Sequence, residues 1–367
     1  MRIKVVSMTL TELEQKRYSR HISLPEIGLV GQQKLKQAKV LCVGAGGLGS
    51  SVISYLTAAG VGTIGIIDDD IVDLSNLQRQ IIHHPASVGQ PKVISAANWI
   101  KENNPHITVI VFQEKLTASN ALNIIPEFDI TIDCTDNFSS RYLINDACFL
   151  TKKPNIQASV LRFDGQVSIF GMPNGPCYRC LFPAMPTTNA IPNCAESGVL
   201  GVLPGLLGII QATEALKLIM GFGETLANRL LCVNTLTMEF NTFKLSRNPD
   251  CVLCGDNPKI KNLKIHTKNE DAIDVASLRD ELRKQPNLML LDVREPFELL
   301  LTAPIANAIN IPLNNIPDHL EQLPRSETFI IYCKSGFRSE YAVTFLRKQG
   351  YDCLNLLGGI EAWKEQS

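Results

Sequence analysis

The sequence predicts an α/β protein in which a mainly parallel sheet with an antiparallel extension is followed by a second, smaller α/β domain. Over residues 40–150, short apolar runs alternate with helical patterns, as is typical of parallel strands joined by helical crossovers. The runs at 166–170 and 231–243 instead have the character of antiparallel strands. A polar, basic stretch at 256–271 indicates a linker, so the predicted domains are residues 1–255 and 272–367.

The composition is that of a globular protein with hydrophobic cores. Of the 367 residues, 45% are hydrophobic and 19% are charged, and the net charge of -1 gives no electrostatic reason to expect nucleic acid or a membrane surface as a partner. Residues 1–10 lack a signal-peptide pattern, so we expect a cytoplasmic protein. The apolar stretch 199–220 is interrupted by Pro204 and predicts a buried or interface helix. Eleven cysteines without a signal sequence favour thiols that bind metal or react over disulfides.

A glycine-rich loop organises the first domain. Strand 40–43 runs directly into a G-x-G-x-x-G pattern, and helix 50–59 follows. The glycines of this loop are Gly44, Gly46, Gly47 and Gly49. The arrangement is Rossmann-like, because the glycines permit a tight turn near a phosphate and the helix N-terminus offers N–H groups to an anion. The next strand ends at Asp68 and Asp70, where a ribose-binding acid is expected, but the pattern leaves the nucleotide open.

The other elements of this domain follow from capping signals and apolar runs. Overlapping T-x-x-E boxes at 9–14 predict a helix start. We predict further strands at 64–67, 107–112 and 129–133, and helices at 32–38 and 139–150. Another helix is expected to open within 89–92, with Pro91 in its first turn, and to run to about residue 103. Asp136 and Asn137 follow strand 129–133 at its carboxyl end, the edge at which parallel sheets bind ligands.

Four polar residues on loops at this edge favour ATP over a nicotinamide cofactor. They are Asn76, Arg79, Lys92 and Asp136. Each one alone is an ordinary surface or capping residue. Together they offer cations to phosphate oxygens and an acid to Mg²⁺, and a nicotinamide enzyme needs neither near its phosphates.

Two C-x-x-C pairs predict a structural Zn²⁺ site. The pairs are Cys177 with Cys180 and Cys251 with Cys254. Four thiolates suit a closed tetrahedral zinc site. The alternative is four ordinary cysteines or a redox pair, but two matched spacings make coincidence a poor explanation.

Cys333 is the candidate nucleophile of the second domain. We predict strands at 289–293 and 328–333 there, with helices at 276–284 and 339–349. Cys333 opens the loop between the second strand and the second helix, where backbone N–H groups, the helix N-terminus and Arg338 would favour a thiolate. The alternative is a buried structural cysteine. Cys194 is a lone loop cysteine that spacing alone leaves open between reactive and inert.

These motifs carry a resemblance to a known family. The relevant stretches are Arg17 to Arg20, Gly44 to Gly49, Asp68 to Asp70, and residues 75–80, 88–92 and 133–137. They resemble the MoeB/ThiF adenylyltransferases, which are relatives of ubiquitin-activating enzymes. Residues 265–367 resemble a rhodanese domain, through 291–296, 310–312 and the six-residue loop 333–338. The combination is similar to the fused molybdopterin-synthase sulfurases. Residues 297–308 depart from the rhodanese pattern because they lack its usual His-Ile-x-Gly-Ala turn.

The resemblance implies roles for the individual residues. Gly44 to Gly49 would lie under the ATP phosphates, Asp70 would hold the ribose, and Asp68 and Asn137 would belong to the same cofactor-binding edge. Phosphate binding would fall to Asn76, Arg79 and Lys92, and Mg²⁺ binding to Asp136. Arg20 would reach into the site of a second copy, which implies a homodimer. Zinc would be held by Cys177, Cys180, Cys251 and Cys254. Cys333 would carry a persulfide beside Arg338, and Cys194 stands where some relatives place a thioester or persulfide-accepting cysteine.

The implied activity has two steps. The first is ATP-dependent adenylation of the C-terminal glycine of a small ubiquitin-like sulfur-carrier protein ending in Gly-Gly. The second is sulfur transfer from Cys333, loaded by a donor such as a cysteine desulfurase, to give a thiocarboxylate for molybdopterin, thiamine or related sulfur metabolism. One alternative is an NAD(P)-dependent oxidoreductase with a redox tail, which explains the glycines and Asp68 but neither Lys92 nor the paired cysteines. The other is a non-catalytic adaptor.

Overall fold

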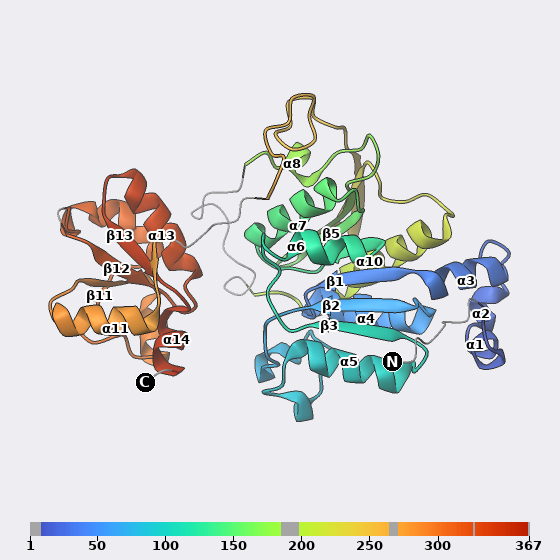
Figure 1. Ribbon diagram of the computed structural model, residues 1–367, viewed down its shortest axis with the longest axis horizontal. Helices are drawn as coiled ribbons and strands as arrows, with labels where there is room; N and C mark the ends of the chain where they lie inside the picture. The colour runs from blue at the N-terminus through green and yellow to red at the C-terminus, as the bar shows by residue number, and fades with distance from the viewer. Residues whose placement is uncertain (1–8, 185–197, 264–270, 326, 366–367) are drawn as a thin grey trace. The chain divides into compact units, whose positions relative to one another are not determined.

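The computed structural model describes residues 9–184, 198–263, 271–325 and 327–365, which fall into two compact units, Met1–Ile265 and His266–Ser367 (Figure 1). Part of the predicted linker packs onto the first unit, since Ile260 and Leu263 lie against its cores.

The first unit is built on one sheet whose strands run in the order β3-β2-β1-β4-β5-β6-β7-β8. The strands are β1 (Lys39–Val43), β2 (Thr63–Ile67), β3 (Thr108–Phe112), β4 (Ile130–Asp133), β5 (Asn155–Leu161), β6 (Asp164–Phe170), β7 (Arg229–Asn234) and β8 (Glu239–Lys244). From β3 to β5 the neighbours are parallel, and from β5 to β8 they are antiparallel. The predicted parallel sheet with an antiparallel extension is therefore confirmed.

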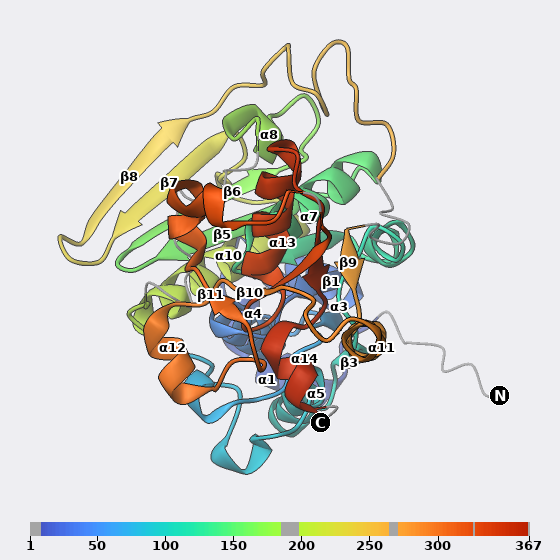
Figure 2. The same ribbon diagram turned by 90° about the vertical axis from the view of Figure 1, so that its left-hand side faces the viewer.

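Two regions of this sheet differ from the sequence prediction. The run 231–243 is a hairpin, β7 and β8, with Met238 in the left-handed region at φ 56°. Figure 2 shows this hairpin extending beyond the rest of the sheet. β5 was not predicted, because polar side chains such as Gln157 and Ser159 interrupt its apolar residues.

Helices cover both faces of this sheet. They are α1 (Glu12–Arg17), α2 (Ser19–Ile22), α3 (Gly28–Gln37), α4 (Gly47–Ala59), α5 (Lys92–Asn103), α6 (Ala121–Ile124), α7 (Phe138–Leu150), α8 (Tyr178–Leu181) and α10 (Val202–Met220), with 3-10 turns η1 (Leu74–Asn76), η2 (Pro85–Ser87) and η3 (Ile125–Glu127). Val40 and Cys42 of β1 point into a core shared with α3, α4, α5 and α10, whereas Leu41 and Val43 point into a core shared with α6 and α7. The alternation follows from the two-residue period of a strand buried on both faces.

Helix α10 is long and apolar enough to span a membrane by length and composition. In the structure it packs against α4, α3, β5 and β6, and it buries Leu203, Leu207 and Ala215 in the main core. Gln211 is also buried and donates its side-chain amide to the Asp133 and Ile156 carbonyl oxygens. The predicted buried helix is therefore present.

The second unit has a five-stranded parallel sheet in the order β11-β10-β12-β13-β9. Its strands are β9 (Ala272–Ile273), β10 (Leu290–Asp292), β11 (Ile309–Asn310), β12 (Phe329–Tyr332) and β13 (Cys353–Leu356). Its helices are α11 (Val275–Lys284), α12 (Pro296–Leu301), η4 (Leu313–Gln322), α13 (Phe337–Lys348) and α14 (Gly359–Glu365). The η4 and α13 segments cover one face, and α11 and α14 cover the other.

Candidate active site

The glycine-rich loop joins β1 to α4 and is held at Ala45 by two side chains. Asp68 Oδ2 accepts the Ala45 N–H at 2.7 Å, and His83 Nε2 lies 3.0 Å from the Ala45 carbonyl oxygen. Because a carbonyl can only accept, Nε2 carries the proton, and Nδ1 then accepts from the Ser95 hydroxyl at 2.9 Å. Burial lowers the pKa of His83, which suits this neutral form. The two peptide groups that flank the Ala45 Cα are thus each held by a side chain.

Two positions of the loop require glycine, one because of its backbone conformation and one because a side chain has no room. Gly44 has φ +99°, a conformation that L side chains rarely adopt. A Cβ on Gly49 would lie 2.1 Å from the Gly44 carbonyl oxygen. Gly46 caps α4 and Gly47 begins it, and both are partly exposed. The loop therefore presents backbone N–H groups at the carboxyl end of β1, as phosphate binding requires.

Lys92 and the two aspartates form a charged cluster beside this loop. Lys92 Nζ donates to Asp70 Oδ2 at 2.7 Å, and the Lys92 N–H donates to the Asp70 carbonyl oxygen at 2.9 Å. Lys92 is buried, whereas the Asp70 side chain is 67% exposed. Burial raises the pKa of Asp68 against the opposing attraction of Lys92 and the hydrogen bonds from Ala45 and Asp70. Lys92 therefore lies at the carboxyl edge of the sheet, paired with Asp70.

Arg79 and Asn76 lie on the segment after Asp73. Arg79 Nη1 donates to the Ser75 carbonyl oxygen at 3.0 Å, and Arg79 Cγ lies 3.6 Å from where a Cβ on Gly47 would be. Asn76 Oδ1 accepts the Asp73 N–H at 3.2 Å in a capping box. The structure thus brings Arg79 to the glycine-rich loop, and Asn76 also serves as a local cap.

Asp136 and Asn137 follow β4 at the same edge. Asn137 is the N-cap of α7, and its Oδ1 accepts from the Ser140 N–H and the Ser139 hydroxyl at 2.9 Å each. Asp136 is exposed and lines a pocket of about 550 Å³ that extends over β5 to β8. The pocket is lined by residues that include Arg141, Ser159, Gln166, Tyr178 and Phe243. Asp136 therefore lies both at the carboxyl edge of the parallel strands and in the lining of this pocket.

Arg20 lies on α2 and is exposed. Figure 1 shows α1, α2 and α3 gathered at one end of the first unit. The predicted contact of Arg20 with a second copy stays a prediction.

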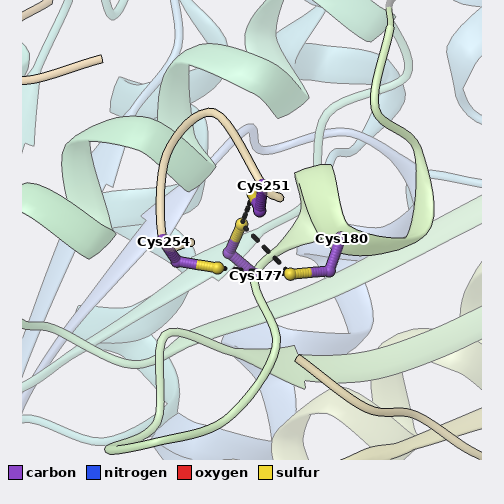
Figure 3. A group of neighbouring side chains, drawn as sticks. All are labelled: Cys177, Cys180, Cys251 and Cys254. Carbon is purple, nitrogen blue, oxygen red and sulfur yellow. Dashed lines mark hydrogen bonds between the residues drawn. The ribbon is translucent and has the colours of Figure 1, made fainter. Parts of the chain in front are cut away.

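The four cysteines of the two C-x-x-C pairs converge (Figure 3). Their sulfur atoms all lie within 4.8 Å of one another, with Cys177 Sγ 3.5 Å from Cys251 Sγ and Cys180 Sγ 3.2 Å from Cys254 Sγ. All four are free thiols. Burial and the neighbouring sulfur atoms raise the pKa of Cys177, and burial raises the pKa of Cys254 to about 12. Four sulfur ligands at this spacing fit a tetrahedral divalent cation, which would hold them as thiolates.

Cys333 lies directly after β12 and is 1% exposed. Its Sγ accepts the Gly336 N–H at 3.2 Å and the Ser339 hydroxyl at 3.5 Å. Arg338 forms a two-pronged ion pair with Glu298 of α12, with Nη1–Oε2 at 2.6 Å and Nη2–Oε1 at 2.7 Å. The loop therefore has the predicted N–H donor at the sulfur. Its predicted cation, Arg338, is paired with the carboxylate of Glu298 from α12.

One predicted residue cannot be placed in the structure, and two residues at the candidate sites were not predicted. Cys194 lies outside the described residues. His83 and Glu298 were missed by sequence reasoning. His83 has no motif of its own, and Glu298 lies in the short segment that departs from the rhodanese pattern, 40 residues before its partner Arg338.

Comparison with known proteins identifies the family. Residues 18–253 match the ThiF family, and residues 274–366 match the rhodanese-like domain. The chain belongs to the ThiF family. This ThiF-family chain is 42% identical over 376 residues to the Mycobacterium tuberculosis protein named "Probable adenylyltransferase/sulfurtransferase MoeZ", covering 97% of this chain and 94% of that one. It is 38% identical over 378 residues to "Adenylyltransferase and sulfurtransferase MOCS3-1" of Zea mays, covering 95% and 81%.

Solved structures support the fold of the ThiF domain. The crystal structure of E. coli MccB has a TM-score of 0.59 and 22% identity, covering 71% of this chain and 77% of that one. PaaA has a TM-score of 0.56 and 20% identity, covering 68% and 78%. At these identities the likeness concerns the fold.

Proposed function

We propose that this protein uses ATP to adenylate the C-terminal glycine of a small ubiquitin-like sulfur-carrier protein and then converts that carboxylate to a thiocarboxylate. The observation that carries the proposal is the union, in one chain, of a ThiF-family domain and a rhodanese-like domain with a cysteine loop. The names of the full-length relatives support it. The ThiF-family domain favours ATP over NAD(P) as the bound nucleotide. The names of the relatives favour an enzyme over a non-catalytic adaptor.

The test is formation of the product. Purified protein, MgATP, a sulfur donor and a carrier protein ending in Gly-Gly should yield a carrier whose C-terminal oxygen is replaced by sulfur, read by mass spectrometry. ATP–pyrophosphate exchange that depends on the carrier should accompany it. If neither signal rises above that of the carrier alone, the proposal is wrong.

We assign the adenylation chemistry to the edge around the glycine-rich loop. A carboxylate oxygen of the carrier attacks the α-phosphorus of ATP, and pyrophosphate leaves. Arg79 and Lys92, together with Arg20 of a second copy in a homodimer, would neutralise the charge that builds on the phosphate oxygens. Asp70 would bind the ribose, and Asp68, which accepts the Ala45 N–H, would belong to the same cofactor-binding edge. A bound Mg²⁺ would add positive charge at the phosphates, and the exposed carboxylate of Asp136 fits that ion.

The pocket beside Asp136 suits the carrier's C-terminal tail. Its volume of about 550 Å³ is formed by the antiparallel strands and by α7 and α8, so it opens directly from the nucleotide edge. Buried Arg141 lines it, and its Nε has no hydrogen-bond partner among the described residues. An unpaired buried donor of this kind favours a carbonyl or carboxylate ligand.

The sulfur step is assigned to Cys333. The terminal sulfur of the persulfide formed there would attack the acyl-adenylate, with AMP leaving, because adenylation turns a poor leaving group into a good one. The product is an acyl disulfide with Cys333, and a second thiol would attack Cys333 Sγ, form a disulfide with it and release the thiocarboxylate. A cysteine desulfurase is the proposed donor. Cys194 stays a candidate acceptor, and we place the enzyme in the cytoplasm.

Zinc binding by the four converging cysteines is proposed as structural. Cys254→Ser should lose the metal and lower the melting temperature by about 10 °C, since ~3–5 kcal/mol of folding energy goes with the ligand set at this domain size. Elemental analysis and thermal unfolding measure both effects. Cys232→Ser, at a partly exposed cysteine of β7 in the same unit, should keep its zinc. Freshly purified wild-type protein without zinc would overturn this assignment.

A further inference from the structure

The loop that carries Cys333 ends at Arg338, and Arg338 is paired with Glu298. The sulfur accepts the Gly336 N–H, and the neutral Ser339 hydroxyl, which also lies within hydrogen-bond distance of the Gly336 carbonyl oxygen, is 3.5 Å from it. Lys334, the first cation of the loop, is exposed, and its Nζ lies 3.5 Å from Glu361 Oε1. Both side chains of this pair are more than half exposed. Solvent screens such a pair strongly. The loop's other cation is Arg338, whose side chain is 15% exposed.

Glu298 engages Arg338 at both ends of its guanidinium. The two N···O distances, 2.6 and 2.7 Å, are those of a bidentate charge-assisted pair. Glu298 Oε2 also accepts the Glu295 N–H at 2.9 Å, which fixes the carboxylate on the first turn of α12. Burial acts to raise the pKa of Glu298, but the Arg338 hydrogen bonds, the Glu295 amide and the charges of Arg338 and Arg294 hold it below its usual value. The carboxylate is therefore charged and aimed at Arg338.

Sulfur donors differ in the charge that they bring to this loop. With thiosulfate, the Cys333 thiolate attacks the outer sulfur of a dianion, the S–S bond breaks, and sulfite leaves with two negative charges. With a neutral persulfide R–S–SH, the same thiolate takes the terminal sulfur with its hydrogen, and R–S⁻ leaves. Only the first reaction brings a dianion to an anion, so only that reaction depends strongly on an available cation.

We propose that Glu298 is a specificity-determining residue which, by neutralising Arg338, makes the Cys333 loop discriminate against dianionic sulfur donors and favour persulfides, which bring at most one negative charge. This inference rests on the proposed sulfur transfer by Cys333 and names the class of donor. A persulfide presented by a protein cysteine brings less negative charge to the sulfur than thiosulfate does. The pair thus directs loading toward a protein donor.

The test compares two donors on the full-length protein. The probes are thiosulfate and 2-hydroxyethyl persulfide, and the readout is the rate constant for persulfide formation on Cys333, followed by mass spectrometry. Glu298→Gln keeps the size of the side chain and removes its charge. It should raise the ratio of thiosulfate to persulfide rate constants on the order of tenfold, because Arg338 becomes available to the dianion. The double variant Glu298→Gln/Arg338→Gln should return the ratio to within about twofold of wild type.

Glu361→Gln is the matched control, since it removes the carboxylate from the other loop cation. Its ratio should change by less than about twofold, because that pair is exposed and screened. Should Glu298→Gln fail to fold, Glu298→Asp replaces it, since an arm shorter by one methylene weakens the bidentate pair and should raise the ratio by about threefold. An unchanged ratio in the folded variant, or an equal rise in Glu361→Gln, would overturn the inference. If neither donor loads wild-type Cys333, the proposed function of the loop itself is wrong.

Discussion

Replacing Asp136 with alanine should abolish ATP–pyrophosphate exchange in the presence of the carrier protein. Asp136 is an exposed carboxylate at the carboxyl end of β4, on the edge that also holds the glycine-rich loop and Lys92. If it holds the Mg²⁺ that neutralises the leaving pyrophosphate, its loss removes that charge stabilisation. Asp68 is committed to the Ala45 N–H, and Asp70 is paired with Lys92.

The matched control lies at the other end of the same strand. Asp129 is also exposed, and its carboxylate accepts the Lys39 N–H at 2.9 Å, so Asp129→Ala tests the removal of a charge from the opposite edge of the sheet. It should keep exchange within about threefold of wild type.

Arg79→Ala should slow exchange on the order of 10²-fold, as expected when one transition-state charge partner is lost. Wild-type exchange in both Asp136→Ala and Arg79→Ala would show that the phosphates bind elsewhere.

Much of the parallel part of the fold could be predicted because its strands are buried on both faces. Strands such as 40–43 and 64–67 read as continuous apolar runs for that reason, and the structure has them as β1 and β2 within one residue. The same rule explains the failure at β5. Its neighbour β6 is antiparallel, and polar Gln157 and Ser159 interrupt its apolar pattern.

The metal cluster was predictable, whereas the details of the other sites were not. Two C-x-x-C spacings are a local signal, and the fold needed only to bring Cys177 and Cys251 together. The role of His83 depends on its contact with the Ala45 carbonyl oxygen, 38 residues away in sequence, and nothing in a His-His dipeptide predicts it. The pairing of Arg338 with Glu298 is likewise non-local. Sequence analysis finds residue types suited to a reaction, but it cannot find the partners that restrain them.

Replacing Cys333 with alanine should eliminate sulfur transfer and leave adenylation intact. The loop places two donors at the thiol sulfur, the Gly336 N–H and the Ser339 hydroxyl, which it shares with the Gly336 carbonyl oxygen. Those two donors can stabilise a thiolate and then a persulfide, and alanine offers no sulfur to either reaction. ATP–pyrophosphate exchange should persist, because the glycine-rich loop and Asp136 belong to the other compact unit. Carrier adenylate should therefore accumulate without becoming a thiocarboxylate.

Two companion variants locate the sulfur path. Cys353→Ala alters a fully buried cysteine of β13 in the same domain and should still load sulfur, which separates loss of the nucleophile from general damage to the core. Cys194→Ala should block thiocarboxylate formation while exchange survives if Cys194 relays the acyl group or accepts sulfur, and should leave the product unchanged if it does neither. Mass spectrometry of the carrier's C-terminus, with ATP and a persulfide donor but no free sulfide, reads all three. A Cys333→Ala enzyme that makes thiocarboxylate at the wild-type rate would mean that sulfur reaches the adenylate by a route that bypasses the rhodanese-like domain.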